Sequence, residues 1–308
     1  MKKYGFPYKG SKNKLAEKIV KLFPDAENFY DLFCGGGAIT HRALIENRWK
    51  NYVINDIDSR CPKLFFDAIN GKFKNETKWI SREDFFKLKD DDGYVAFCWS
   101  FGNIGENYLY SKEIEPYKKA LHYAIVFGDY SLGKDLGFDF SVVDTIQCVQ
   151  ERKLFLQRYL KNNTIGKGSP LKESIECSEI SQNLNNLERL QRLQSLQSLQ
   201  SLQSLQFSNL SYDDIEIKPN SIIYCDIPYK NTGNYNNIDF DHEAFYTWCK
   251  KQTELCFISS YEMTEDFIPI AEFNHRCILS CKNQATIEKV FIPKHQLELY
   301  KARLSACI

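Results

Sequence analysis

The sequence contains the run Asn28-Phe29-Tyr30-Asp31-Leu32-Phe33-Cys34-Gly35-Gly36-Gly37, an apolar segment that ends in three glycines. The apolar part predicts a short buried strand. The glycines let the backbone approach a ligand closely, which side chains would prevent. A helix is expected over 38–45, directly after the glycines, and a second strand over 51–54. This order of elements predicts the start of a nucleotide-binding α/β domain.

An acid follows the second predicted strand. Asp56 comes about 20 residues after Gly35. In dinucleotide-binding proteins, an acid at about this separation from the glycine loop accepts hydrogen bonds from the ribose hydroxyls. The loop itself lacks the G-x-G-x-x-G spacing of those proteins. A tight turn and a surface acid would give the same letters, so this pair by itself indicates some nucleoside-like cofactor and no more.

A later strand ends in a combination that suits an amino group as substrate. The apolar run 221–225 is followed by Asp226-Ile227-Pro228-Tyr229. Asp226 can accept one hydrogen of an amino group, and the backbone carbonyl of Ile227 can accept the other. Tyr229 can stack on a base that has been flipped out of a duplex. The alternative is an ordinary strand end followed by a proline-containing turn.

An aromatic and basic turn precedes the first predicted helix. The turn is Pro7-Tyr8-Lys9-Gly10-Ser11-Lys12, and the amphipathic helix is expected over 13–23. Lys12 can meet the carboxylate of an amino-acid-like ligand. Taken alone, this motif is weak.

Strand signals return in the last third of the chain. An apolar strand is expected over 255–260, and residues 276–280 and 288–292 are expected to form a terminal hairpin. Between about residues 63 and 180 the sequence has a different pattern. Polar helical segments and aromatic-rich segments alternate there without the regular order of strands and helices found in βαβ units.

The chain is therefore divided into three predicted parts. Residues 1–62 and 205–308 form the catalytic domain, and residues 63–180 form an inserted, mainly helical subdomain. Residues 181–206, which contain Leu-Gln-Ser triplets, form a low-complexity connector. Leucine at every third position fits neither the period of a strand nor that of a long straight α-helix, although a short 3₁₀ segment would stack the leucines on one face.

Bulk properties exclude several classes of protein. No apolar run approaches the roughly 18 residues of a membrane span, and the start lacks the apolar core of a signal peptide. The 11 cysteines show no zinc-type spacing, which favours reduced thiols in a cytoplasmic protein. The 40 basic and 40 acidic residues balance, which argues against binding to nucleic acid through charge alone. One basic stretch fits either phosphate contacts or a solvated helix face: Arg152, Lys153, Arg158, Lys161 and Lys167.

Taken in this order, the motifs resemble those of the Dam-like DNA adenine N6-methyltransferases, especially the phage and prophage type. The family's basic turn, glycine loop, acid and D-P-P-Y motif correspond here to residues 8–12, 31–37, 55–56 and 226–229. The resemblance covers roughly residues 4–60 and 205–295. It implies a Rossmann-like α/β fold that uses S-adenosylmethionine, with the insert as target-recognition subdomain.

The resemblance also implies a reaction and a set of site residues. The enzyme would transfer a methyl group from S-adenosyl-L-methionine to the N6 amino group of adenine in double-stranded DNA, without a metal. The catalytic residues would be Asp226, Ile227, Pro228 and Tyr229. The cofactor-binding residues would be Tyr8, Lys12, Asp31, Phe33, Gly35, Gly37, Asp56 and Tyr212.

Three departures from the family pattern keep alternatives open. Ile227 replaces the usual first proline, Pro7-Tyr8 replaces Lys-Trp, and Ser211-Tyr212 replaces an Asp-aromatic pair, with Asp213 as a substitute acid. The alternatives are a non-catalytic protein that binds S-adenosylmethionine and DNA, and a methyltransferase for cytosine N4 or RNA adenine. The target word, a restriction–modification partner and the oligomeric state, a monomer included, are left open.

Overall fold

The computed structural model describes residues 3–162, 184–199, 204–229, 240–276 and 285–305. The chain forms two compact units. The first consists of Met1–Lys72 and Leu193–Ile308, and the second of Phe73–Arg192.

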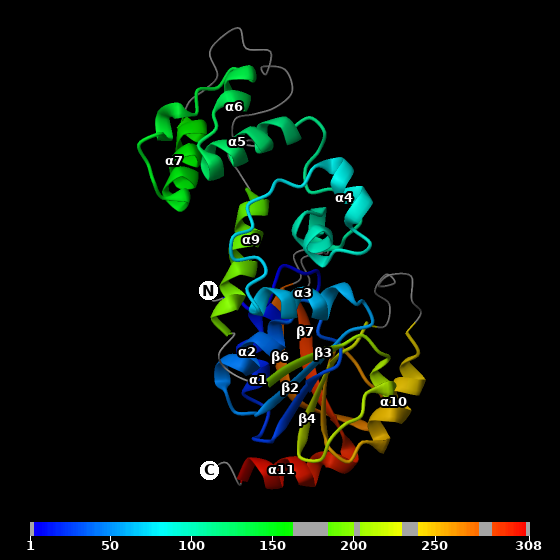
Figure 1. The fold of residues 1–308 in the computed structure, drawn as a ribbon. Coiled ribbons are helices and arrows are strands. Elements are labelled where there is room, and N and C mark those ends of the chain that lie inside the picture. The colour runs from blue at the N-terminus through cyan, green and yellow to red at the C-terminus, as the bar shows by residue number, and fades with distance from the viewer. Residues whose placement is uncertain (1–2, 163–183, 200–203, 230–239, 277–284, 306–308) are drawn as a thin grey trace. The chain divides into compact units, whose positions relative to one another are not determined.

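A seven-stranded sheet forms the centre of the first unit (Figure 1). Its order is β3 (Ser204–Ser208), β2 (Asn51–Asn55), β1 (Asn28–Asp31), β4 (Ser221–Asp226), β5 (Leu255–Ser260), β7 (Ala285–Pro293) and β6 (Phe267–Arg276). The strands from β3 to β5 are parallel, whereas β7 runs antiparallel to both β5 and β6. The predicted α/β class is confirmed, and so are the four strands that were predicted to begin at residues 28, 51, 221 and 255.

The sheet reverses its winding between β1 and β4. From β1 the chain goes outward to β2 on one side, while β4 pairs with the other side of β1. Open α/β sheets bind their ligands at the carboxyl ends of strands beside such a reversal. Asp31, Asn55 and Asp226 end the three strands at this point.

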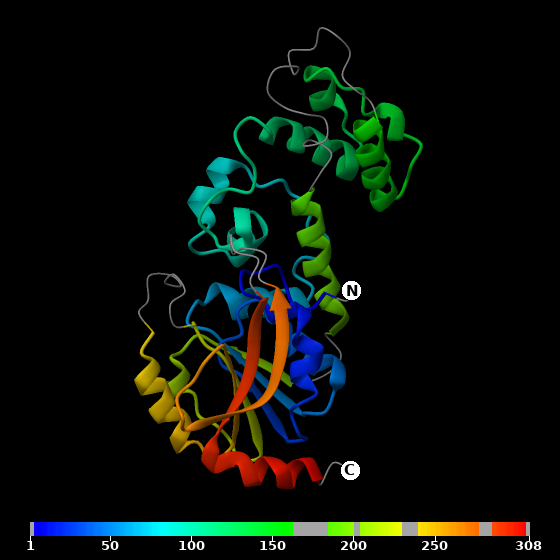
Figure 2. The same cartoon turned by 180° about the vertical axis from the view of Figure 1, so that it is seen from behind.

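Helices cover both faces of the sheet. The helices α1 (Ala16–Val20) and α2 (Ala38–Glu46) lie on one side, and α10 (His242–Lys251) lies on the other (Figures 1 and 2). The described residues of this unit also form the 3₁₀ helix η1 (Lys12–Lys14), α3 (Arg60–Ile69), η6 (Leu196–Leu199), η7 (Tyr212–Asp214), η8 (Lys294–Gln296) and α11 (Leu297–Ser305). The single helix expected over 13–23 is thus two shorter pieces that end before Pro24.

Strand alternation decides which side chains of β4 reach the site. Ile223 and Cys225 pack in the core cluster beneath α10, whereas Tyr224 faces the other side and contacts Phe23 at 5.7 Å between ring centroids. Successive side chains of a strand point to opposite faces. Asp226 therefore projects to the side of Tyr224.

The predicted connector has regular structure where it is described. Helix α9 (Asn185–Ser195) continues into the 3₁₀ helix η6, and after residues 200–203, which lie outside the described ranges, β3 pairs with β2. The spaced leucines are buried: Leu187, Leu190, Leu193, Leu196 and Leu199. The short 3₁₀ segment with its leucines on one face is thus present at Leu196–Leu199, whereas the α-helix before it and the edge strand after it were not predicted.

The hairpin begins earlier than expected. Strand β6 starts at Phe267 and ends at Arg276, and the rest of the expected strand over 276–280 lies outside the described residues. The sequence of β6 mixes polar and apolar residues without a regular period, so the strand is defined by its pairing with β7.

The second unit is helical in its described part. It contains α4 (Arg82–Leu88), the π-helical turn η2 (Tyr94–Cys98), η3 (Phe101–Asn103), α5 (Glu115–Phe127), α6 (Ser131–Asp135), η4 (Ser141–Val143) and α7 (Val149–Asn162). Its start differs from the expected boundary at residue 63, because α3 belongs to the first unit. The ring of Phe66 on α3 contacts Phe207 on β3 at 4.9 Å.

The basic stretch of α7 is partly used within this unit. Lys153 is buried and pairs with Glu188 at 3.0 Å, and Arg152 donates to the carbonyls of Ile146 and Ile125. These two side chains therefore stabilise the unit, and of the expected phosphate-facing set Lys167 lies outside the described residues.

Two further expectations concern the whole chain. Across the described ranges, no helix combines the length and the apolar character needed to cross a bilayer. The cysteines in those ranges are free thiols, and all of them except Cys148 are buried.

Candidate active site

The glycine loop after β1 is held in a conformation that requires glycine. Gly35 and Gly37 have φ values of 44° and 65°, in the left-handed region that side chains disfavour. A Cβ on Gly37 would also lie 2.4 Å from the ring of Phe65. One on Gly35 would lie 2.8 Å from the ring of Tyr8, which covers the loop. The loop thus has no room for larger residues.

Asp56 braces this loop. Its Oδ2 accepts a hydrogen bond from the backbone N–H of Gly35 at 2.8 Å, and its Oδ1 accepts one from Asp58 at 3.0 Å. Burial raises the pKa of Asp56 to about 6 against the opposing effect of these bonds. Each carboxylate oxygen keeps a second lone pair for a ligand hydroxyl. The sequence predicted a ligand-binding acid here, but not its support of the loop.

Asp31 carries a buried acceptor with no partner among the described residues. The side chain is 1% exposed. Its Oδ2 accepts from Thr40 Oγ1 at 2.6 Å, whereas Oδ1 has no hydrogen bond to any residue that the structure describes. Burial raises the pKa of Asp31 to about 7, although the Thr40 bond opposes this. A buried unpaired acceptor is costly, and a cationic N–H donor from a ligand would satisfy it. The amino group of S-adenosylmethionine fits this requirement.

Lys12 pairs with the predicted catalytic acid. Its Nζ lies 2.8 Å from Asp226 Oδ1 and 3.9 Å from Glu288 Oε1, and it donates a hydrogen bond to the Tyr229 hydroxyl. Burial by itself would lower the pKa of Lys12, but the two carboxylates outweigh it and the net shift is upward. Lys12 is therefore a cation. The sequence directed it to a ligand carboxylate and did not predict this pairing.

Asp226 keeps one oxygen available. Oδ1 receives Lys12 at 2.8 Å and the Tyr229 hydroxyl at 3.4 Å, while Oδ2 has no hydrogen-bond partner within the described ranges. Burial raises the pKa of Asp226, and the neighbouring Lys12 opposes that rise. One half of the carboxylate is thus anchored, and the other half can accept a substrate N–H.

Ile227 fills the core where the family usually has a proline. Its side chain is 3% exposed and belongs to the cluster that contains Phe245 and Cys249 of α10. Pro228 follows it and is partly exposed. The substitution is therefore explained by packing, and a backbone carbonyl is present at this position with either residue.

Tyr229 is held from several elements. Its hydroxyl donates to Glu288 Oε1 on β7 at 2.8 Å, and its ring lies 4.4 Å from that of Tyr261, which follows β5. The sequence patterns did not predict this contact of Glu288 with Tyr229. The sequence does contain an indication of it. Glu288 lies at an even spacing from Val290 and Ile292, so in a strand its side chain points to the same buried face as theirs.

Aromatic rings border the glycine loop on the side of α10. Phe33 stacks on Tyr212 at 5.6 Å with an angle of 30° between the rings, and Tyr212 also contacts Trp248 at 5.2 Å. Ser211 donates a hydrogen bond to the carboxylate of Asp213. The structure therefore brings Phe33 and Tyr212 together and leaves Asp213 exposed beside them.

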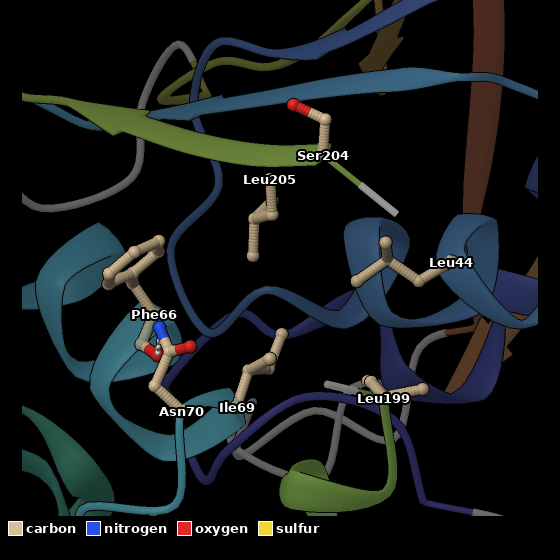
Figure 3. Close-up of a pocket in the computed structure, with 7 residues that line it drawn as sticks. All are labelled: Leu44, Phe66, Ile69, Asn70, Leu199, Ser204 and Leu205. Atoms are coloured by element: carbon tan, nitrogen blue, oxygen red, sulfur yellow. Dashed lines mark hydrogen bonds between the residues drawn. The ribbon is translucent and has the colours of Figure 1, made fainter. Parts of the chain in front are cut away.

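A separate hollow of about 260 Å³ lies between α2, α3, η6 and β3 (Figure 3). None of the predicted site residues lines it, and it contains no charged side chain. Its lining is Leu44, Phe66, Ile69, Asn70, Leu199, Ser204 and Leu205. This hollow is therefore distinct from the site at the strand ends.

The glycine loop after β1 suits a nucleoside. Beside it, the anchored carboxylate of Asp226 suits an amino group, and the fixed ring of Tyr229 suits the face of a base. This combination at the carboxyl ends of a parallel sheet defines the class of amino methyltransferases.

Comparison with known proteins identifies the particular family. Residues 8–256 match the D12 class N6 adenine-specific DNA methyltransferases, a range that covers most of the chain. The protein belongs to this family and is an adenine-specific DNA methyltransferase. The predicted Dam-like resemblance is confirmed, and the match argues against cytosine N4 or RNA as the substrate. No curated protein matches the chain.

Proposed function

We propose that the strand-end site transfers the methyl group of S-adenosylmethionine to N6 of an adenine flipped out of double-stranded DNA. The observation that carries this proposal is the anchored Asp226. Lys12 holds one of its oxygens at 2.8 Å, and the other oxygen is left for the substrate. Asp31, with its unpaired Oδ1, ends the adjacent strand β1.

The cofactor residues divide by the chemistry that each can offer. S-adenosylmethionine, when bound, supplies a methyl group on a positively charged sulfur. Asp31 would take its amino group, and Asp56 its ribose hydroxyls. Gly35 and Gly37 provide close approach of the backbone, and the rings of Tyr8, Phe33 and Tyr212 border the loop. Lys12 bonds to Asp226 and Tyr229 and keeps one of its three N–H donors, which we assign to the methionine carboxylate.

Asp226 and the Ile227 carbonyl act on the base. The lone pair of adenine N6 is delocalised into the ring, so the amino group is a poor nucleophile. Two acceptors for its hydrogens favour a pyramidal nitrogen and stabilise the positive charge that develops on it. Lys12 favours the ionised form of Asp226, which is the form that accepts. The proton on N6 becomes acidic only after transfer, so Asp226 need not be a strong base.

Tyr229 and the second unit act on DNA. Flipping a base costs a few kcal/mol, which stacking on an aromatic ring helps to offset. The ring of Tyr229 is partly exposed and fixed at its hydroxyl, which suits this role.

We assign target recognition to the helical unit Phe73–Arg192. The resemblance supports a phage-type or restriction–modification setting, and the buried free thiols support a cytoplasmic one.

The test is methyl incorporation from labelled S-adenosylmethionine into unmethylated genomic DNA, with the product nucleosides separated. We expect label in N6-methyladenine, and label in N4-methylcytosine would contradict the base assignment. Asp226→Ala should abolish turnover while cofactor binding persists, and the exposed Asp25→Ala serves as control. A wild-type protein that binds cofactor and DNA but transfers no label would instead favour the non-catalytic alternative.

A further inference from the structure

Glu288 is a buried carboxylate in an apolar strand. It lies on β7, on the same side of the strand as the buried Val290 and Ile292, and is 2% exposed. It also lies outside residues 8–256, the range that matches the family. Burial raises its pKa, and Lys12 opposes the rise. A buried carboxylate costs stability unless it is paired, and an apolar residue would be the stable choice there.

The partners of Glu288 all belong to the proposed base site. Its Oε1 accepts from the Tyr229 hydroxyl at 2.8 Å and lies 3.9 Å from Lys12 Nζ. These are its only polar contacts in the described part of the chain. The carboxylate therefore contributes to the site and not to a separate structural network.

The Tyr229 hydroxyl has one proton and two carboxylates within reach. Asp226 Oδ1 is 3.4 Å away and Glu288 Oε1 is 2.8 Å away. The shorter bond takes the proton, because the distance to Glu288 is that of an ordinary O–H···O hydrogen bond, about 2.5–3.0 Å, and the distance to Asp226 is longer. The oxygen lone pairs of the hydroxyl then remain for Lys12. Without Glu288, the same proton would turn to Asp226 and weaken it as an acceptor for adenine N6.

We propose that Glu288 is a positioning residue of the methyl-transfer site. By accepting the Tyr229 proton, it fixes the ring for stacking and keeps that proton away from Asp226. This inference rests on the proposed function. The two can fail separately. Wild-type protein that forms no N6-methyladenine would refute the proposed function, whereas the role of Glu288 is tested only by comparing variants with an active wild type.

The test combines variants at the two ends of this hydrogen bond. Glu288→Leu removes the acceptor at similar size, Glu288→Gln retains an acceptor oxygen, and Tyr229→Phe removes the proton while it keeps the ring. Glu272→Leu is the matched control, because Glu272 lies on the same hairpin but is exposed. Single-turnover methylation and S-adenosylmethionine affinity are measured for each variant and for Glu288→Leu in the Tyr229→Phe background.

We expect Glu288→Leu to slow single-turnover methylation about 10- to 100-fold, as small misplacements of reacting groups do. Cofactor affinity should stay within about threefold, and Glu288→Gln should recover most of the rate. In the Tyr229→Phe background, Glu288→Leu should change the rate less than about twofold, because coupled residues are not additive.

Three results would overturn the proposal. They are a normal rate for Glu288→Leu, a Glu288→Gln variant as slow as Glu288→Leu, and effects of Glu288→Leu and Tyr229→Phe that multiply. If Glu288→Leu does not fold, Tyr229→Phe decides by itself. A wild-type rate for Tyr229→Phe would show that the hydrogen bond has no positioning role.

Discussion

Replacing Asp31 by Asn should stabilise the cofactor-free protein and weaken its binding of S-adenosylmethionine. The two effects have one cause. Asp31 is 1% exposed and one of its oxygens has no partner in the described residues, so its charge is costly until a cation binds. Asn keeps an acceptor for Thr40 but removes the charge.

The magnitude follows from the pKa of Asp31. Burial raises this pKa from 3.8 to about 7. An acid whose pKa is higher in the folded state destabilises the fold when it ionises, so the penalty is absent below about pH 4, grows with pH, and is complete above about pH 7. At about 1.4 kcal/mol per pKa unit, the full penalty is of order 4 kcal/mol. Between pH 5 and pH 8 it should grow by about 2 to 3 kcal/mol.

Urea unfolding without cofactor, at pH 5 and pH 8, measures this penalty. The free energy of unfolding of Asp31→Asn minus that of wild type should be about 2 to 3 kcal/mol more positive at pH 8 than at pH 5, which means a larger stability gain at pH 8. An unpaired amide hydrogen of Asn offsets part of the gain by about 1–3 kcal/mol at both pH values. The exposed Asp25→Asn is the control and should show no such pH dependence.

Calorimetric titration with S-adenosylmethionine measures the second effect. Wild-type affinity should fall about tenfold per pH unit below about pH 7, because Asp31 must lose its proton to meet an ammonium group. Asp31→Asn should bind at least about tenfold more weakly at pH 8, and its affinity should not depend on pH in this way. Equal stability differences at pH 5 and pH 8, or unchanged cofactor affinity in the variant, would refute the assignment of Asp31.

Three further substitutions test other parts of the site. Gly37→Ala should lose cofactor binding and more than about 2 kcal/mol of stability. Its control, Gly102→Ala, has a φ of 69° and open space around it, so it should cost only about 1–2 kcal/mol. Equal losses of stability in the two variants, measured by calorimetry, would contradict the steric argument. Lys12→Gln should raise the pKa of Asp226 further, so the methylation rate should fall more at pH 6 than at pH 8; a parallel loss at both would exclude this role. Ile227→Pro should keep methylation within about tenfold while it lowers stability by about 1–3 kcal/mol, and a loss of activity in folded protein would show that Ile227 has a catalytic role beyond its carbonyl.

Local patterns predicted the centre of the fold. The strand, glycine loop, helix and second strand of the first block form as expected, and so do β4 and β5, because buried parallel strands appear as continuous apolar runs. The edge strands did not follow from pattern. Strand β3 lies in a tract of period three, and β6 mixes polar and apolar residues, so their pairing with β2 and β7 defines them.

The sequence by itself determined the class of enzyme and the acids at the strand ends. Asp31, Asp56 and Asp226 follow runs whose parallel alignment brings their ends to one edge of a sheet, which the linear order already indicates. Only the tertiary structure decided the partners of those acids. Lys12 reaches Tyr229 across 217 residues of sequence, and Glu288 reaches it across 59. No local pattern encodes such pairs, because they depend on how η1 and β7 pack against the end of β4 once the sheet has formed.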